Sequence, residues 1–403
     1  MIQTSIARSL PTAAPESLGL CPQRTRHVIT VLQAEVQRQR LPGAVALIAR
    51  HGKLALYESV GALDPATGTP MPRDAIFRIY SMTKPIVSVA AMMLMEQGQL
   101  LLSEPVAKYL PEYAAQTLAS LVDGSVQLQA VRQGATLYDL LRHTAGLTYE
   151  FMGSTSVQRQ YAQARIGSRQ RSNAEFSLAL AALPLLFEPG TMWEYSRATD
   201  VLGRVLEVVS GQTLGAYLQE HIFKPLGMID TGFSVPLQQH ARIAEPFVSD
   251  PEGAMQMRMI DVRTDSKLES GGGGLVSTAM DYARFLQFML NRGELGGVRL
   301  LSRATVDFMT ADHLGDIAVN SGTARTLLPP GHGFTLGFAL RKQLGLASVP
   351  GSVGTYFWGG MAGTAFFVDP AQDLFACLML QAPNQREYYR MLFRDLVYAT
   401  LIV

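Results

Sequence analysis

The alternation of apolar and polar positions predicts strands at both ends of the chain and helices in its middle. Near the N-terminus, apolar runs at 44–49 and 54–60 are separated by the turn-forming residues 51–53, which is typical of a β-hairpin. After about residue 330 short apolar runs return, and the last two surround an Asp-Pro turn at 369–370. Both ends of the chain are therefore expected to supply strands.

Helical spacing of apolar side chains dominates between about residues 99 and 290 and also occurs nearer both termini. The expected helices cover residues 23–40, 81–98, 137–142, 198–209, 280–290 and 388–403. The simplest arrangement is an α/β fold with an additional all-α part, in which one antiparallel sheet is built from both termini and flanked by helices. We expect residues 1–80 and 295–403 to form this sheet domain and residues 81–294 an inserted, mainly helical domain. The active site is expected at their junction, where ligand clefts are common.

Composition and charge narrow the classes of partner. The 403 residues carry a formal net charge of +1, so no attraction to nucleic acid or to an anionic membrane surface is expected. No apolar stretch reaches about 18–20 uninterrupted residues, and the N-terminus lacks the apolar core of a signal peptide. We therefore expect a cytoplasmic protein. Cys21 and Cys377 are far apart and belong to no Cys/His cluster, which favours two free thiols and no metal site.

A serine and a lysine open the most apolar helix pattern of the chain. Residues 80–93 are YSMTKPIVSVAAMM, so Ser81 stands three positions before Lys84. Residues at i and i+3 share one helix face, and a serine at a helix N-terminus lies where free backbone N–H groups can stabilise an oxyanion. Lys84 can then take up the proton of Ser81. The alternative is a capping serine beside a solvated lysine, and the motif alone does not decide between the two.

Five segments together resemble the serine β-lactamase and penicillin-recognising superfamily, specifically its class C β-lactamase-like branch and, within it, the family VIII carboxylesterases. They are SMTK (81–84), LRHTAGL (141–147), FEPGTMWEYSRATDVLGRVLEVVSG (187–211), GGGGLVSTAMDYARF (271–285) and FWGGMAG (357–363). They appear in the order of that family and cover the chain from about residue 20 to its end. The resemblance implies a β-lactamase-like fold with Ser81 as nucleophile and Lys84 as its partner.

The resemblance places Tyr195 at the tyrosine of the family's Tyr-x-Asn motif. There a phenol that shares its proton with Lys84 can act as general base toward Ser81 and later protonate the leaving alkoxide. The sequence leaves open which of Lys84 and Tyr195 is the base in each step. Arg197 occupies the position where β-lactamases have an asparagine that contacts the β-lactam side chain. Arg197 is therefore expected to contact substrate and to disfavour inherited β-lactam recognition.

The third family motif, normally Lys-Thr-Gly, is replaced by Trp358-Gly359-Gly360. The missing cation removes a charge-assisted contact worth about 1.5–3 kcal/mol, which disfavours substrates with a carboxylate next to the reacting bond. Glycines on a strand allow close approach of substrate. The resemblance implies that the backbone N–H groups of Ser81 and Met361 hold the oxyanion. The alternative for these glycines is a bend in a core strand.

Residues beside and between these motifs are further candidates for a role in the site. Tyr149 and Phe151 follow the HTAGL segment and are expected either to wall an acyl pocket or to anchor a lid. His143 is structural by resemblance to the family. The arginine-rich stretch 158–171 favours a solvated segment, with a lid as the alternative. The chain has no G-x-S-x-G motif, so ester hydrolysis would have to use Ser81.

The function expected from the sequence is that of a serine carboxylesterase acting on small, short-chain esters through an acyl-serine intermediate, without cofactor or metal. Weak opening of cephalosporins is expected to accompany it, because the nucleophile machinery is shared. Three alternatives stay open: an acyltransferase that passes the acyl group to an alcohol, a true β-lactamase or D-aminopeptidase, and a non-catalytic binding protein. The sequence does not fix the oligomeric state and is compatible with a monomer.

Overall fold

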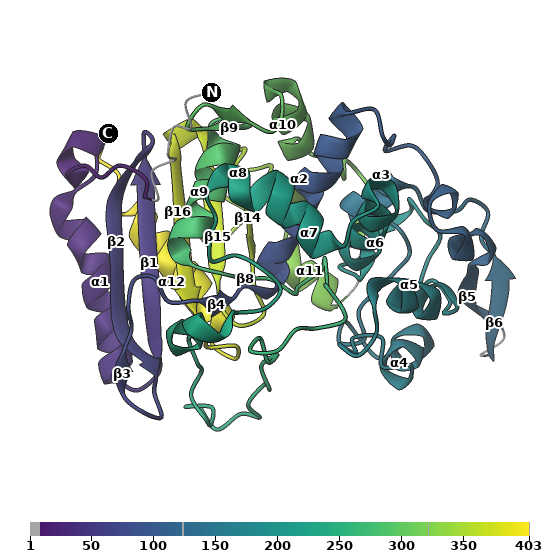
Figure 1. Ribbon diagram of the computed structural model, residues 1–403, viewed down its shortest axis with the longest axis horizontal. Coiled ribbons are helices and arrows are strands. Elements are labelled where there is room, and N and C mark those ends of the chain that lie inside the picture. The colour runs from purple at the N-terminus through teal and green to yellow at the C-terminus, as the bar shows by residue number, and fades with distance from the viewer. Residues whose placement is uncertain (1–8, 123–124, 321, 403) are drawn as a thin grey trace.

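The structure, a computed structural model, describes residues 9–122, 125–320 and 322–402. Its centre is one antiparallel sheet with the strand order β12-β13-β14-β15-β16-β1-β2-β3 (Figure 1). The strands are β12 (His332–Phe334), β13 (Ala339–Arg341), β14 (Tyr356–Gly359), β15 (Ala365–Asp369), β16 (Leu374–Leu380), β1 (Gly43–Arg50), β2 (Lys53–Asp64) and β3 (Thr69–Pro70). The expected sheet is confirmed, since strands from both ends of the chain are neighbours in it.

Strand β1 joins the two ends of the chain. Leu47 of β1 lies opposite Tyr57 of β2 on one side and Cys377 of β16 on the other. Every residue of β1 is buried, as expected for a central strand covered on both faces. The predicted β1–β2 and β15–β16 hairpins are both present. Cys21 and Cys377 are free thiols, as expected.

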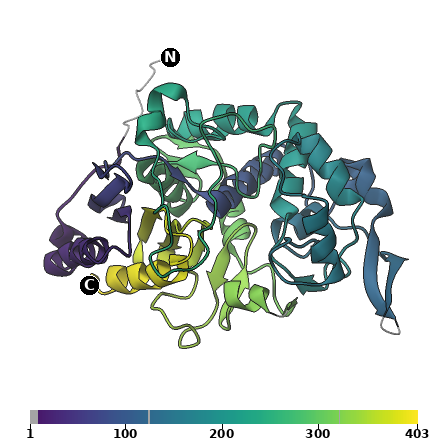
Figure 2. The same cartoon turned by 90° about the horizontal axis from the view of Figure 1, so that it is seen from below.

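Helices cover both faces of the sheet. The helices are α1 (Pro22–Gln37), α2 (Thr83–Glu96), α3 (Leu137–Leu141), α4 (Ser156–Gln163), α5 (Asn173–Ala181), α6 (Ala198–Ser210), α7 (Leu214–Leu218), α8 (Lys224–Leu226), α9 (Ala279–Leu290), α10 (Arg303–Thr310), α11 (Thr323–Leu327) and α12 (Arg386–Tyr398). α1 and α12 lie side by side, as Figure 2 shows, and pack on one face. α9 packs on β16 and β1 although it falls within 81–294. The domain limits at 80 and 294 therefore stay a prediction.

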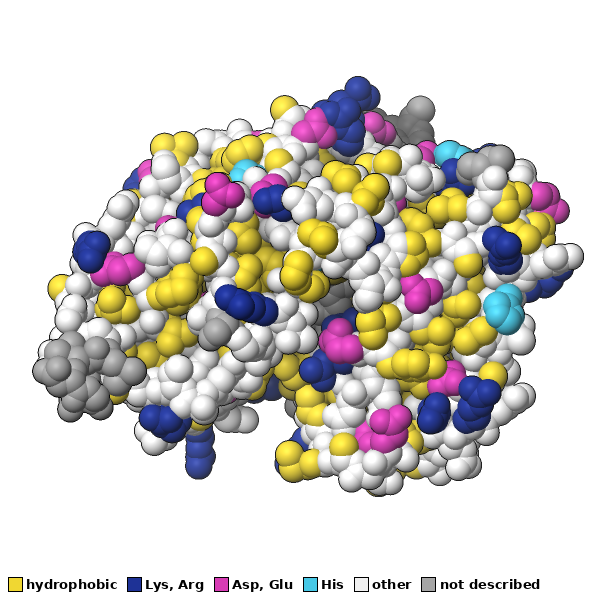
Figure 3. All heavy atoms as spheres, turned by 180° about the vertical axis from the view of Figure 1, so that it is seen from behind, with side chains coloured by type: hydrophobic (Ala, Val, Ile, Leu, Met, Phe, Trp, Pro, Cys, Tyr) yellow, Lys and Arg dark blue, Asp and Glu magenta, His cyan; other side chains and the backbone are white. Residues whose placement is uncertain are grey.

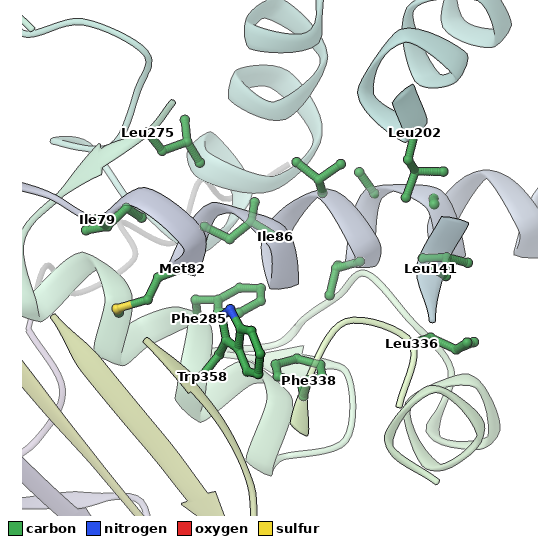
Figure 4. Close-up of a cluster of buried hydrophobic side chains, with 14 of the residues drawn as sticks. Ile79, Met82, Ile86, Leu141, Leu202, Leu275, Phe285, Leu336, Phe338 and Trp358 are labelled. Atoms are coloured by element: carbon green, nitrogen blue, oxygen red, sulfur yellow. The ribbon is translucent and has the colours of Figure 1, made fainter. Parts of the chain in front are cut away.

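Helix α2 is the buried axis on which the candidate nucleophile is mounted. Its residues from Thr83 to Leu94 are all buried, which is the pattern of a helix inside a core rather than at a surface. Leu141 and Leu202 lie near α2, and so do Phe285, Phe338 and Trp358 (Figure 4). Burial of each large apolar side chain contributes about 1.5–3 kcal/mol, so the start of α2 is firmly positioned.

One region differs from the expected pattern. A hairpin of β5 (Thr117–Val122) and β6 (Ser125–Ala130) stands in the middle of the chain, where helices were expected. The Asp-Gly pair at 123–124 in the sequence is a hairpin signal that was overlooked. The arginine-rich stretch 158–171 contains residues 158–163 of the short helix α4, and Arg169 Nε donates a hydrogen bond of 3.0 Å to Ser266 Oγ.

Four two-stranded pairs lie outside the main sheet: β4 (Phe77–Arg78) with β8 (Val276–Ser277), β5 with β6, β7 (Met192–Trp193) with β11 (Ala318–Val319), and β9 (Glu294–Leu295) with β10 (Val298–Arg299). The β4–β8 pair lies directly before α2 and holds the segment that leads to Ser81. Within the part of the chain that the structure describes, none of the helices combines the length and the hydropathy needed to cross a bilayer.

Candidate active site

Ser81 lies in a single 3-10 turn, Tyr80–Met82, that leads directly into α2. The residue before it, Tyr80, has a φ of 42°, a left-handed conformation that costs a non-glycine residue about 1–2 kcal/mol. Its phenol oxygen accepts a hydrogen bond of 3.0 Å from the Ile260 backbone N–H, which holds it in place. Backbone strain directly before a candidate nucleophile is typical of functional sites.

Lys84 is buried at the base of the site, with 1% of its surface exposed. Its Nζ donates hydrogen bonds to the Tyr149 hydroxyl, at 2.9 Å, and to the Gly272 carbonyl, at 2.6 Å. Nζ also lies 4.5 Å from the centre of the Tyr195 ring. The alternative of a solvated lysine is therefore wrong. The nitrogen of a lysine side chain has three positions for N–H groups, so these two hydrogen bonds leave a third that can hold a proton or face Ser81.

Tyr195 stands just before α6 and is surrounded by aromatic rings. The ring centres of His143, Tyr149 and Trp358 lie 5.0, 5.3 and 5.1 Å from its own. Trp358 Nε1 donates a hydrogen bond of 3.3 Å to the Tyr195 hydroxyl oxygen. The tryptophan that replaces the family lysine thus contacts the candidate base directly.

Tyr149 and His143 are neutral groups beside this pair. Burial, together with the charge of Asp200, raises the pKa of Tyr149 well above its usual value, so its hydroxyl keeps its proton. Burial, together with the charge of Lys84, lowers the pKa of His143 well below its usual value. Its Nδ1 lies 3.1 Å from Ser196 Oγ. His143 therefore packs and orients, while Tyr149 supplies a neutral oxygen to Lys84.

The wall opposite Ser81 is built by Gly360 and Met361 at the end of β14. A Cβ on Gly360 would lie 2.4 Å from the carbonyl oxygen of Ile79, so only glycine lets this wall approach the nucleophile turn. The Arg390 guanidinium donates to the Gly360 carbonyl oxygen. Because a peptide unit is planar, holding this oxygen also fixes the direction of the Met361 N–H on the other side of the same unit.

A cleft of about 700 Å³ opens over these groups. The predicted site residues that line it are Ser81, Phe151, Tyr195, Trp358, Gly359 and Met361. Lys84 lies behind this surface and meets Tyr149 there. The structure thus gathers these residues from four distant segments of the chain around one opening.

Arg197 lies behind Tyr149, apart from the residues that line the cleft. Its guanidinium pairs with Glu150 at 2.6 Å and with Asp200 at 3.7 Å, and its Cζ is 4.7 Å from the centre of the Tyr149 ring. These contacts fix the ring that receives the hydrogen bond from Lys84. Direct contact between Arg197 and substrate stays a prediction.

Sequence reasoning missed two features of this site. The bond between Lys84 and Tyr149 joins residues 65 positions apart, whereas the sequence predicted Tyr149 as the wall of an acyl pocket or the anchor of a lid. Arginines of the C-terminal helix also line the cleft, at positions 386, 390 and 394. Their spacing of four places them on one helix face, and this regular spacing is the pattern that could have revealed them.

Comparisons with known proteins agree with this geometry. The sequence model of the Beta-lactamase family matches residues 28–398. The esterase EstB of Burkholderia gladioli is 33% identical over 389 residues, which cover 92% of this chain and 94% of EstB. Among solved structures, EstCE1, a hydrolase with promiscuous acyltransferase activity, matches with a TM-score of 0.77 and 29% identity over 95% of this chain and 99% of its own.

Simvastatin synthase (LovD) from Aspergillus terreus is also similar in structure, with a TM-score of 0.76 and 27% identity over 93% of this chain and 98% of that protein. The predicted fold class and the resemblance to β-lactamase-like esterases are thereby confirmed. Since the family model spans most of the chain and EstB matches nearly the full length of both proteins, this chain belongs to the beta-lactamase family.

Proposed function

We propose that the protein is a serine carboxylesterase in which Ser81 is the nucleophile. The observation that carries the proposal is the placement of Ser81 at the start of α2, facing the cleft, with a buried Lys84 one turn away between two phenol rings. The similarity to a protein named an esterase supports this choice of reaction.

The reaction would proceed in two halves. The proton of Ser81 Oγ passes to the Lys84–Tyr195 pair while Oγ bonds to the ester carbonyl carbon, and the N–H groups of Ser81 and Met361 hold the oxyanion. The C–O bond to the alcohol then breaks, and the pair returns the proton to the leaving oxygen. Water repeats these steps on the acyl-serine, releasing the acid and free Ser81. No cofactor is required, and the substrate is a small ester.

Ser81→Ala is expected to abolish hydrolysis of p-nitrophenyl butyrate and labelling by a fluorophosphonate. Ser154→Ala is a matched control, since Ser154 is exposed in a loop. Unchanged turnover in the Ser81 variant, with the control also active, would remove Ser81 from the mechanism and with it this proposal.

Lys84→Ala and Tyr195→Phe are each expected to lower kcat by about 10²-fold or more, the usual effect of losing a positioned acid–base group. Steady-state kinetics on p-nitrophenyl butyrate measures both. Nearly full activity of Tyr195→Phe would exclude the tyrosine from proton transfer while leaving Ser81 in place.

Acyl transfer to an alcohol is the second candidate, because EstCE1 and simvastatin synthase are both close in structure. The acyl-serine would be the same and an alcohol would replace water. Product analysis with competing alcohols separates the two: mainly free acid supports the esterase. A nitrocefin kcat/KM above that of p-nitrophenyl butyrate would favour a β-lactamase instead. A cytoplasmic location and a monomeric state belong to the same proposal.

A further inference from the structure

Arg394 is a buried cation without a counter-ion, two turns along α12 from Arg386. It is 7% exposed, and its Nη2 is buried with no hydrogen-bond partner. Among residues 9–122, 125–320 and 322–402, no carboxylate forms an ion pair with it. Burying an unpaired charge costs several kcal/mol, so an apolar residue here would give a more stable protein.

Two aromatic rings hold Arg394 in this position. Its Cζ lies 4.4 Å from the centre of the Phe357 ring and 5.0 Å from that of Phe367. Contacts of this kind attract a cation but leave its N–H groups without acceptors. Burial lowers the pKa of Arg394 to about 10, so it remains charged at neutral pH.

Glu387 on α12 and Asp369 on β15 are engaged elsewhere, and Asp395, the next residue along α12, forms no ion pair with Arg394 within the described residues. Glu387 pairs with Arg390 at 2.7 Å and with Arg386 at 3.4 Å. Asp369 accepts hydrogen bonds from the Tyr398 hydroxyl, at 2.5 Å, and from backbone N–H groups. The guanidinium of Arg394 is therefore left for a group from outside the chain.

Arg394 lines the same cleft as Ser81, and that cleft has an excess of positive charge. Among the described residues its charged lining consists of three arginines and Glu387, in a chain whose net charge is only +1. On the face drawn in Figure 3, basic and acidic side chains are interspersed. The lining of the cleft that holds Ser81 and Arg394 also includes the apolar side chains of Trp358, Phe366 and Met391.

We propose that Arg394 is a carboxylate-binding subsite, and that the natural substrate is an ester carrying a carboxylate separated from the scissile bond by an apolar segment. The inference rests on the proposed function for the role of Ser81. A planar guanidinium is suited to a carboxylate because two N–H groups can bind its two oxygens. Trp358 stands where the Lys-Thr-Gly motif of the β-lactamase superfamily would place a lysine, so the carboxylate is recognised at Arg394 and not next to the reacting bond.

The test compares p-nitrophenyl monoesters of dicarboxylic acids from glutarate to sebacate with p-nitrophenyl esters of monocarboxylic acids of equal length. The wild-type protein is expected to prefer the acidic ester only at the longer chain lengths. Arg394→Met and Arg394→Gln should lower the ratio of acidic to neutral kcat/KM by about 10–100-fold, as loss of charge-assisted hydrogen bonds implies. Arg303→Met, at an exposed position on α10, should leave the ratio unchanged. Butyrate esters of ω-hydroxy acids carry the carboxylate on the alcohol side of the ester. Their hydrolysis, measured by the release of acid, shows whether the subsite recognises a carboxylate on that side.

Each outcome decides one point. The subsite is overturned if the ratio of acidic to neutral kcat/KM is unchanged in both Arg394 variants. It is also overturned if the wild type prefers neutral esters at every chain length, with the carboxylate on the acyl side and on the alcohol side. Arg394→Met is expected to melt no lower than the wild type, and a lower Tm of both neutral variants with an unchanged ratio would make Arg394 structural. If neither ester series is hydrolysed, the proposed function fails, and binding of suberate to Ser81→Ala still tests the subsite alone. The subsite is supported if suberate raises the Tm of Ser81→Ala but not that of Ser81→Ala/Arg394→Gln. It is overturned if suberate does not raise the Tm of Ser81→Ala.

Discussion

At the residue scale, the candidate site depends on a contact that no local pattern contains. Ser81, Lys84 and Tyr195 could be located from short motifs because spacing and order identify them. The bond between Lys84 and Tyr149 could not, since it requires the fold to bring a helix start and a loop together. The unpaired state of Arg394 is likewise a property of the folded chain, because it depends on which carboxylates lie within reach.

Tyr149→Phe tests this contact. The change removes the hydroxyl that accepts from Lys84 and leaves a buried N–H without its partner, which costs about 1–3 kcal/mol. We expect kcat/KM on p-nitrophenyl butyrate to fall about tenfold, less than for Tyr195→Phe, because the Gly272 carbonyl still holds Lys84.

Tyr217→Phe is the matched control, since the Tyr217 hydroxyl is buried and has no hydrogen-bond partner in the described structure. Wild-type kinetics in Tyr149→Phe would mean that Gly272 alone positions Lys84. A loss as large as that of Tyr195→Phe would instead make Tyr149 a participant in proton transfer.

At the element scale, prediction succeeded where one period dominated a segment. The hairpin of β1 and β2 and the helices α2, α6 and α9 lie close to the expected residues. The β5–β6 hairpin was missed because its strands are short and stand among helical segments, so the surrounding pattern concealed an Asp-Gly turn signal. The last helix ends at Tyr398 and not at 403, and the backbone N–H of Cys21 bonds to the Thr400 carbonyl instead.

Helix α9 carries a carboxylate that should make stability depend on pH. Asp281, in its first turn, is 4% exposed and accepts hydrogen bonds from the Asp230 N–H and the Thr231 hydroxyl. Burial raises the pKa of Asp281 to about 6. The pKa of an aspartate in the unfolded chain is about 3.9, so between about pH 3.9 and pH 6 the folded protein holds this proton more tightly than the unfolded chain does. Stability from this group is therefore complete below about pH 4 and is lost as the pH rises through about 6.

Asp281→Asn should remove this dependence, because an amide oxygen still accepts both hydrogen bonds and carries no charge. The free energy of unfolding of the variant minus that of the wild type should be larger at pH 8 than at pH 4, by up to about 3 kcal/mol. Urea unfolding at both pH values measures the difference, with the exposed Asp316→Asn as control. A constant difference between variant and wild type across this range would show that Asp281 titrates alike in both states.

At the scale of the whole molecule, the strand patterns at both ends of the chain correctly indicated a sheet built from both termini. It did not show how continuous the interior is. One hydrophobic cluster contains Leu47 of β1, Ile86 of α2 and Leu202 of α6, so the sheet and the helices around Ser81 share a single core. The division into two domains stays a prediction, because a sequence pattern reports which face of an element is apolar and not what that face touches.

A shared core predicts that the sheet and the helical part unfold together. Tryptophan fluorescence, far-UV circular dichroism and esterase activity should be lost in one coincident urea transition. Leu47→Ala and Leu202→Ala, in the two parts of the core, are both fully buried and should each lower the free energy of unfolding by about 2–5 kcal/mol. Each variant should move all three signals by the same amount. Leu202→Ala could instead shift activity and fluorescence while part of the dichroism signal keeps a separate transition. In that case the sheet would fold without the helices, and the molecule would have two independent cores.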